Sequence, residues 1–173
     1  VKQHLANKRQ GTAKTLEKSE MSGSTKKLHR QKSTGGSRKG SIKSPLFKGG
    51  ARVFGPKPRD YHFKLNKKVK DLARRSALTH KAKDGAIRVV DAMSMSAPKT
   101  SEYLAFLKAF ELNGRKSVLV VPTKDDNIVL SARNIQRTRV VVASELNTYD
   151  IMNASGLLIV KDAIGLLEAT LTK

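Results

Sequence analysis

The residues with the clearest chemical potential are cations set closely together in the first third of the chain. Residues 21–59 contain eleven Lys and Arg residues, no Asp or Glu, and seven of the chain's twelve glycines. Lys and Arg neutralise phosphates, and the planar Arg guanidinium can bind two phosphate oxygens at once. Rings that can stack on unpaired bases stand in and beside this segment: His29, Phe47, Phe54, Tyr61 and Phe63. This pattern predicts binding to nucleic acid. A solvated charged face or a localisation signal is the plainer alternative.

The charge of the chain is concentrated in its first half. The whole chain of 173 residues has a formal net charge of +21, residues 1–83 carry +20 of it, and residues 84–173 carry +1. Apolar residues follow the opposite trend, with 22 among the first 83 residues and 44 among the last 90. We therefore expect the hydrophobic core in the second half and a polyanionic partner for the first. An acidic solvating protein is excluded.

The basic segment predicts an extended loop. Alone in water it cannot bury enough apolar surface to fold, so we expect it to be disordered without a partner. Leu46, Phe47, Val53 and Phe54 lie on either side of the paired glycines 49–50 and suggest a docking surface. If the segment runs out and back, about 20 residues each way at ~3.3 Å per residue reach on the order of 60 Å.

The second half alternates strand-like and helix-like segments. Four strands are expected, at 87–90, 117–121, 140–142 and 156–160. Five helices are expected, at 66–81, about 100–112, 127–135, 148–152 and 163–171. Continuous apolar strands separated by helices are typical of a parallel sheet covered on both faces. The predicted fold class is α/β, a three-layer globular domain with a mostly parallel sheet, plus the long basic extended loop.

Details of the helices can also be predicted. Asp125 and Asp126 precede a helix, where their negative charge suits the helix dipole better than acid–base catalysis. Thr148 is expected to cap the helix that follows it. In the helix at 66–81, the apolar periodicity places four side chains toward the core. These are Val69, Leu72, Ala73 and Leu78.

Catalytic, cofactor and metal sites find little support. The loop from Gly35 to Ser41 resembles a phosphate loop, but its Lys does not stand between the last Gly and the Ser, and no strand precedes it. No glycine-rich dinucleotide motif follows any expected strand. The four histidines, His4, His29, His62 and His80, all lie in the basic half, where few carboxylates could orient an imidazole ring. Asp60 and His62 have no nucleophilic Ser and no further metal ligands beside them, so they suggest a local hydrogen bond. We expect no catalytic residue, no cofactor and no metal.

Membrane insertion and secretion are not expected either. Apolar runs such as 118–121 are four residues long, far below the roughly 20 needed to span a bilayer. The chain contains no cysteine, which fits a reducing compartment, and no signal peptide is evident at its amino end.

Several ordered blocks resemble one known family. The blocks are 9–12, 26–35, 38–45, 49–50, 53–56, 58–61, 66–68, 97–100 and 131–134. Together they closely resemble the bacterial form of the L-four family of large-subunit ribosomal proteins, the universal uL-four family. The resemblance implies three parts: residues 1–10 as the end of an N-terminal helix, 11–63 as an extended basic RNA-binding arm, and 64–173, together with 1–10, as an α/β globular domain. It also implies that a strand precedes the residues given.

The family resemblance implies a structural role and no catalysis. The expected function is to bind large-subunit ribosomal RNA, support early subunit assembly and line the peptide exit tunnel, with possible repression of the protein's own operon. Expected partners are ribosomal RNA, neighbouring large-subunit ribosomal proteins, the nascent peptide and macrolide antibiotics, with no membrane. The expected location is the ribosome in the cytoplasm, of bacterial type, with an organellar ribosome as the alternative.

Charge pattern and resemblance together predict the site residues. The RNA-binding residues are expected to be Lys26, Lys27, Arg30, Lys32, Arg38, Lys39, Lys43, Lys48, Arg52, Lys57, Arg59, Lys67 and Lys68. The resemblance places Arg30, Gln31, Lys32, Ser33, Thr34 and Gly35 at the tunnel tip. Three positions depart from the family pattern: His29 replaces a frequent Trp, Ser33 replaces a Gly, and Gly36 replaces an Arg. The Ser removes a residue that accepts positive φ easily.

The sequence leaves two other classes of function open. One is an RNA-modifying or nucleotide-binding enzyme with a Rossmann-like domain and a basic arm, which would need a cofactor loop that the sequence does not show. The other is a free-standing regulatory or chromatin-like nucleic-acid-binding protein, which the charge allows but the ordered family blocks do not favour.

Overall fold

The computed structural model describes residues 1–171, and these fall into two units. One unit is Lys2–Phe63, and the other joins Val1 to the residues from Lys64 onward. The division between arm and globular domain, including the assignment of residues 1–10 to the globular domain, stays a prediction. The two units are therefore described one at a time.

The globular unit is built on a four-stranded sheet. Its strands are β1 (Ile87–Val90), β2 (Ser117–Val121), β3 (Thr138–Val142) and β4 (Gly156–Val160), in the order β1-β4-β2-β3 with every pairing parallel. The two central strands, β2 and β4, are buried along their whole length. A strand covered on both faces needs apolar side chains at successive positions, which explains the continuous apolar runs. The predicted parallel α/β fold is confirmed.

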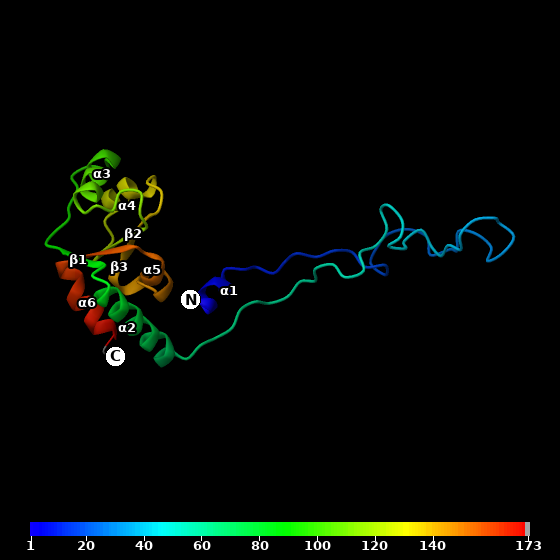
Figure 1. Ribbon diagram of the computed structural model, residues 1–173, viewed down its shortest axis with the longest axis horizontal. Helices are drawn as coiled ribbons and strands as arrows, with labels where there is room; N and C mark the ends of the chain where they lie inside the picture. The colour runs from blue at the N-terminus through cyan, green and yellow to red at the C-terminus, as the bar shows by residue number, and fades with distance from the viewer. Residues whose placement is uncertain (172–173) are drawn as a thin grey trace. The chain divides into compact units, whose positions relative to one another are not determined.

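Helices cover both faces of this sheet (Figure 1). On one face α2 (Lys67–Lys83), α5 (Thr148–Asn153) and α6 (Lys161–Leu171) share a core with Val118, Val120 and Leu157. On the other face α3 (Thr100–Ala109) and α4 (Asp126–Arg133) share a core with Leu119 and Leu158. The 3-10 turn Ala143–Glu145 follows β3. Successive strand residues thus supply opposite cores, which makes the three layers.

The helix caps are partly as predicted. Asp125 is the N-cap of α4, and its side chain accepts a hydrogen bond from the N–H of Asn127 (2.9 Å). The predicted cap Thr148 is wrong, because Asn147 precedes α5 and accepts from the N–H of Asp150 (2.8 Å). An Asn side chain caps at least as well as a Thr, so the earlier of the two residues takes this position.

The predicted inward face of α2 is wrong at its first turns. Val69 is 50% exposed and Leu72 is 66% exposed, whereas Ala77 is buried and Leu78 packs on the core. The second half of α2 therefore makes the contacts of this helix with the hydrophobic core. Helix α3 also ends at Ala109, three residues before the predicted end.

The other unit contains helix α1 (Lys2–Asn7) followed by irregular backbone. Residues 8–66 hold no helix or strand. Within residues 1–171, no helix has the length and apolar character required to cross a membrane.

Candidate nucleic-acid interface

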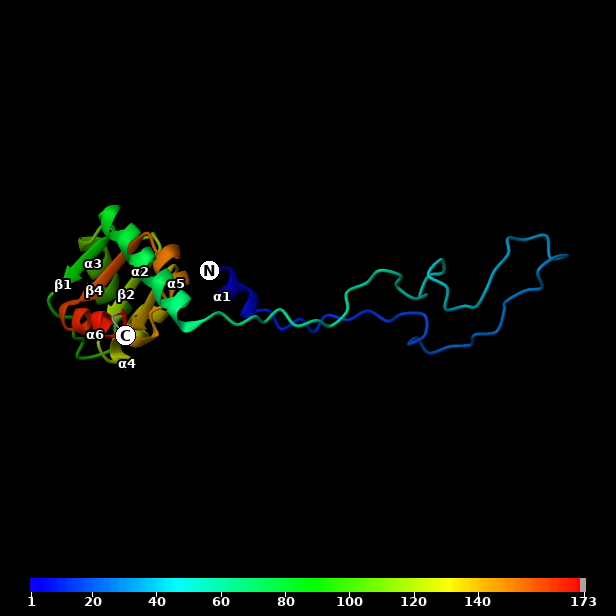
Figure 2. The ribbon, with the colours of Figure 1, turned by 90° about the horizontal axis from the view of Figure 1, so that it is seen from below.

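Two limbs of the basic unit are joined at their base by backbone hydrogen bonds. The N–H of Thr15 donates to the carbonyl of Pro56 (3.0 Å), and the N–H of Arg59 donates to the carbonyl of Gly11 (3.0 Å). Further out, the N–H of Arg52 donates to the carbonyl of Leu16 (3.1 Å). The partners run in opposite directions along the chain, so residues 11–20 form an outgoing limb and residues 50–61 a returning limb. Figure 2 shows the two limbs running beside each other.

Glycines permit this close approach of the limbs. A Cβ on Gly11 would lie 1.9 Å from the carbonyl oxygen of Arg59, and Gly11 also has a φ of +68°. A Cβ on Gly55 would lie 1.7 Å from the hydroxyl oxygen of Thr15 and 2.7 Å from its Cβ. Any larger residue at either position has to push the limbs apart.

An aromatic and cationic cluster closes the base of the limbs. The guanidinium carbon of Arg9 lies 3.8 Å from the centre of the Tyr61 ring, and that of Arg59 lies 4.4 Å from it. The hydrogen bond with Arg59 lowers the pKa of Tyr61. Because two guanidinium groups already contact this ring, the main role of Tyr61 is to hold the two limbs together and not to stack on a base.

The carboxylates of the limbs form ion pairs and hydrogen bonds near the base. Lys14 forms an ion pair with Glu20 (2.8 Å), and its hydrogen bond lowers the pKa of Glu20. Lys57 pairs with Glu17, and the hydrogen bond between them raises the pKa of Lys57. The predicted RNA contact Lys57 is therefore held by Glu17. Asp60 accepts a hydrogen bond from the N–H of His62 (2.7 Å), which confirms the local hydrogen bond expected for that pair.

Beyond Glu20 the limbs carry cations without carboxylates. None of the predicted RNA-binding cations between residues 21 and 52 takes part in an ion pair of the described structure. All of them are exposed except the half-buried Lys43. Repulsion among these cations has no internal compensation, which is the electrostatic condition for binding a polyanion.

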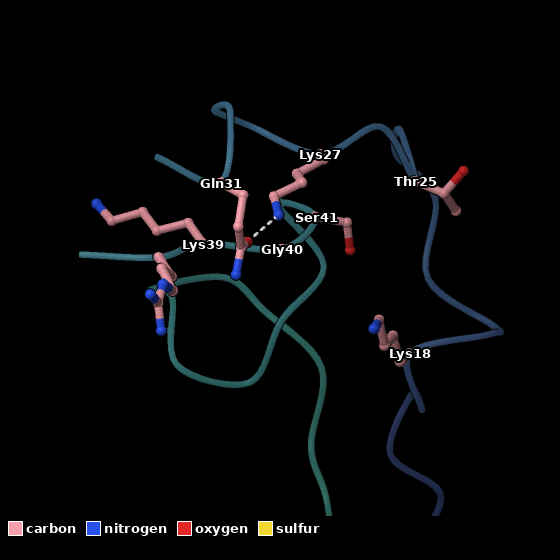
Figure 3. A pocket seen from close by; sticks show the side chains of 8 residues that line it. Lys18, Thr25, Lys27, Gln31, Lys39, Gly40 and Ser41 are labelled. Carbon is pink, nitrogen blue, oxygen red and sulfur yellow. Dashed lines mark hydrogen bonds between the residues drawn. The ribbon is translucent and has the colours of Figure 1, made fainter. Parts of the chain in front are cut away.

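Four of the predicted residues meet at one pocket in this segment (Figure 3). The pocket has a volume of about 460 Å³ and is lined by Lys18, Thr25, Lys27, Gln31, Arg38, Lys39, Gly40 and Ser41. The ammonium group of Lys27 donates to the side-chain oxygen of Gln31, and the N–H of Leu28 donates to the carbonyl of Gly40 (3.1 Å). The buried hydroxyl of Ser41 has no hydrogen-bond partner in the described structure. Cations beside a free hydroxyl donor suit a phosphate oxygen.

The segment Arg30 to Gly35 is exposed throughout. Ser33 has a φ of +68° and Gly35 a φ of +66°. The position where the family pattern has Gly therefore keeps the left-handed conformation although a Ser occupies it, at a cost that a Gly would not carry.

The remaining predicted residues differ in their surroundings. Phe54 is fully exposed, and the half-buried Phe47 lies with its ring centre 5.5 Å from the ammonium group of Lys39. His29 and Phe63 are exposed. Lys67 and Lys68 are exposed in the first turn of α2, in the globular unit. Within residues 1–171, no cluster of three His, Asp or Glu side chains is arranged to hold a metal ion.

Comparison with known proteins gives a consistent result. Residues 1–170 match the Ribosomal protein L4/L1 family. The chain is 54% identical over 168 residues to the large ribosomal subunit protein uL4 of Parabacteroides distasonis, covering 97% of this chain and 80% of that protein. It is 52% identical to the protein of the same name from Phocaeicola vulgatus, over 99% of this chain and 83% of the relative. It is 48% identical to the protein of the same name from Flavobacterium johnsoniae, over 100% of this chain and 83% of the relative.

Proposed function

Because the chain belongs to the ribosomal protein L4/L1 family, we propose that it binds large-subunit ribosomal RNA through residues 11–63. It is a structural protein of the large ribosomal subunit and not an enzyme, and it works in the ribosome, in the cytoplasm. Neighbouring ribosomal proteins of the large subunit are its protein partners.

The observation that carries the proposal is the separation of cations from carboxylates. Residues 21–59 hold eleven Lys and Arg residues and no Asp or Glu, and backbone hydrogen bonds join the limbs mainly near their base. Such a segment gains its order from the RNA, whose phosphates neutralise it. The mechanism is electrostatic neutralisation of phosphates, with the glycines allowing the backbone to approach the RNA closely.

The finer role of the segment rests on the family resemblance. We propose that Arg30 to Gly35 form the tip that lines the peptide exit tunnel, close to the nascent peptide and to bound macrolides. Early binding of several RNA segments supports assembly of the subunit. Repression of the protein's own operon, by binding the leader transcript, belongs to the same proposal.

Sedimentation of a cell lysate tests the proposal directly. The protein is followed by mass spectrometry across the free, small-subunit, large-subunit and polysome fractions of a sucrose gradient. We expect stoichiometric amounts of the protein in the large subunit, and we expect them to survive a high-salt wash, because many phosphate contacts would have to break at the same time. Protein found mainly free, or released by modest salt, would overturn the proposal.

A further inference from the structure

The amino ends of the four parallel strands carry a second group of cations. Parallel strands begin at the same edge of a sheet, and the register pairs Ser117 with Thr138. Lys116 and Arg137, the residues just before these two, are therefore neighbours on adjacent strands. The cations at this edge are Arg88, Arg115, Lys116, Arg137 and Arg139, and all are exposed. The carboxylates near it are Asp84, Glu111 and Asp150.

The opposite edge of the sheet has the opposite character. The residues that follow the strands or begin the next helices there include Asp91, Asp125, Asp126, Glu145 and Asp162. Two lysines at that edge are paired with carboxylates, Lys99 with Glu102 (3.0 Å) and Lys124 with Asp126 (2.8 Å). Residues 84–173 have a net charge of only +1, so their charge is segregated between the two edges of the sheet.

Neutral oxygens hold most of the cations at the amino edge. The ammonium group of Lys116 donates to the side-chain oxygen of Asn153 (2.8 Å), and the guanidinium of Arg137 donates to the carbonyl of Gly114 (3.1 Å). Arg88 donates to the carbonyl of Phe110. These contacts orient the side chains without neutralising them. Among the ion pairs of residues 1–171, Arg139 alone of this group has a carboxylate partner, the buried Asp150 (2.6 Å).

A pocket and a strained residue coincide at this edge. The pocket has a volume of about 210 Å³, and Lys116, Arg137, Arg139 and Asn153 are among the residues that line it. Arg137 has a φ of +63°, a conformation that costs a residue with a Cβ roughly 1 kcal/mol or more. A Gly would avoid this cost, so the backbone tolerates a change of Arg137 to Gly.

We propose that this amino edge is a second binding site for the sugar–phosphate backbone of large-subunit ribosomal RNA, with Lys116 and Arg137 contacting phosphates. The inference rests on the proposed function and extends it to the globular unit. An RNA backbone fits better than an acidic protein, because no exposed large apolar side chain lines this pocket in the described structure. The centre of a protein interface is rich in such side chains.

Salt titration of RNA binding by the full chain tests the inference. The amino-edge variant is Lys116→Gln with Arg137→Gly, since Gly suits the positive φ. The matched control is Lys99→Gln with Lys124→Gln, which removes the same charge from the opposite edge. An arm variant, Lys43→Gln with Lys48→Gln, tests the proposed function. The affinity of each for a transcript of the large-subunit RNA is measured between 50 mM and 200 mM salt.

The three variants separate the inference from the proposed function. We expect the slope of log affinity against log salt to become shallower by about 1.4 to 1.8 in both the amino-edge and the arm variants, and to stay unchanged in the control. An unchanged slope in the amino-edge variant beside a reduced one in the arm variant would overturn the inference alone. Unchanged slopes in both would overturn the proposed function as well.

A second measurement detects the contact itself and not its effect on affinity. A photo-crosslinking residue placed at position 116 is incorporated into large subunits in the cell, and its adducts are identified. Adducts with ribosomal RNA are expected. Adducts with neighbouring proteins only would overturn the inference.

Discussion

Replacing Gly11 by Ala should weaken RNA binding far more than replacing Gly35 by Ala. Both glycines lie in the arm and have nearly the same backbone conformation, with φ of +68° and +66°. A Cβ on Gly11 would meet the carbonyl oxygen of Arg59 at 1.9 Å, whereas nothing lies within 4 Å of a Cβ on Gly35. The Gly35→Ala variant therefore carries the conformational cost alone, and Gly11→Ala carries the same cost and a backbone collision.

The size of the difference follows from what the collision breaks. Separating the limbs removes the hydrogen bond from Arg59 to Gly11 (3.0 Å), for which a net contribution of about 1 kcal/mol is typical. It also loosens the contact of the Arg9 guanidinium with the Tyr61 ring on the returning limb (3.8 Å), with a contribution of about 0.5–1 kcal/mol at an exposed site. The expected excess is about 1.5–2 kcal/mol, or on the order of ten- to thirtyfold in affinity.

The assay is filter binding of each full-length variant to the large-subunit RNA transcript at one fixed salt concentration. A parallel thermal melt checks the globular unit, and the core residues of that unit all lie at or beyond Ala77. Equal losses of affinity in the two variants would refute the reasoning, because the limb contact at Gly11 would then have no importance beyond its backbone conformation.

Three further expectations concern other parts of the molecule. Deleting residues 26–48 should leave the thermal melt of the globular unit within a few degrees of wild type while preventing stable entry into large subunits; normal incorporation on a sucrose gradient would contradict the role of the arm. Changing Lys32 should alter growth under macrolides more than changing Lys124, which is paired with Asp126; equal drug responses would count against the tip assignment. Tyr103→Phe should raise the free energy of unfolding by about 1 kcal/mol, because the buried phenol hydroxyl has no partner in the described structure. Burial raises the pKa of Tyr103, so wild-type stability should fall as the pH rises above about 10, where the unfolded phenol ionises, and in urea titrations of the variant that fall should be smaller.

The strands could be predicted from the sequence because their burial requires a visible pattern. Leu119 and Leu158 face one core while Val120 and Leu157 face the other, and only an apolar run satisfies both. The prediction of the inward face of α2 was wrong because helical periodicity shows where apolar side chains gather but not whether another element covers them. Val69 is the example: it lies at the predicted spacing and is half exposed.

Contacts between distant parts of the arm could not be predicted in the same way. Gly11 and Arg59 are 48 positions apart, and neither belongs to a periodic segment that would indicate pairing. The cations of the arm were visible because charge density is a property of composition. The amino-edge cations were not, since Lys116 and Arg137 become neighbours only through the strand order β1-β4-β2-β3 and its register.

The cations of the arm and those of the amino edge differ in the conformational entropy that is lost when they bind RNA. This difference implies an order in which the two sites bind. Fixing the backbone of a flexible residue costs roughly 1–2 kcal/mol, so ordering the 39 residues from 21 to 59 costs on the order of tens of kcal/mol, which many RNA contacts must offset together. Lys116 and Arg137 stand on a folded sheet edge and are already oriented by Asn153 and Gly114. A site that needs no ordering can capture a single RNA segment early. We therefore expect the globular unit to bind first, and the arm to become ordered only as further RNA segments gather around it.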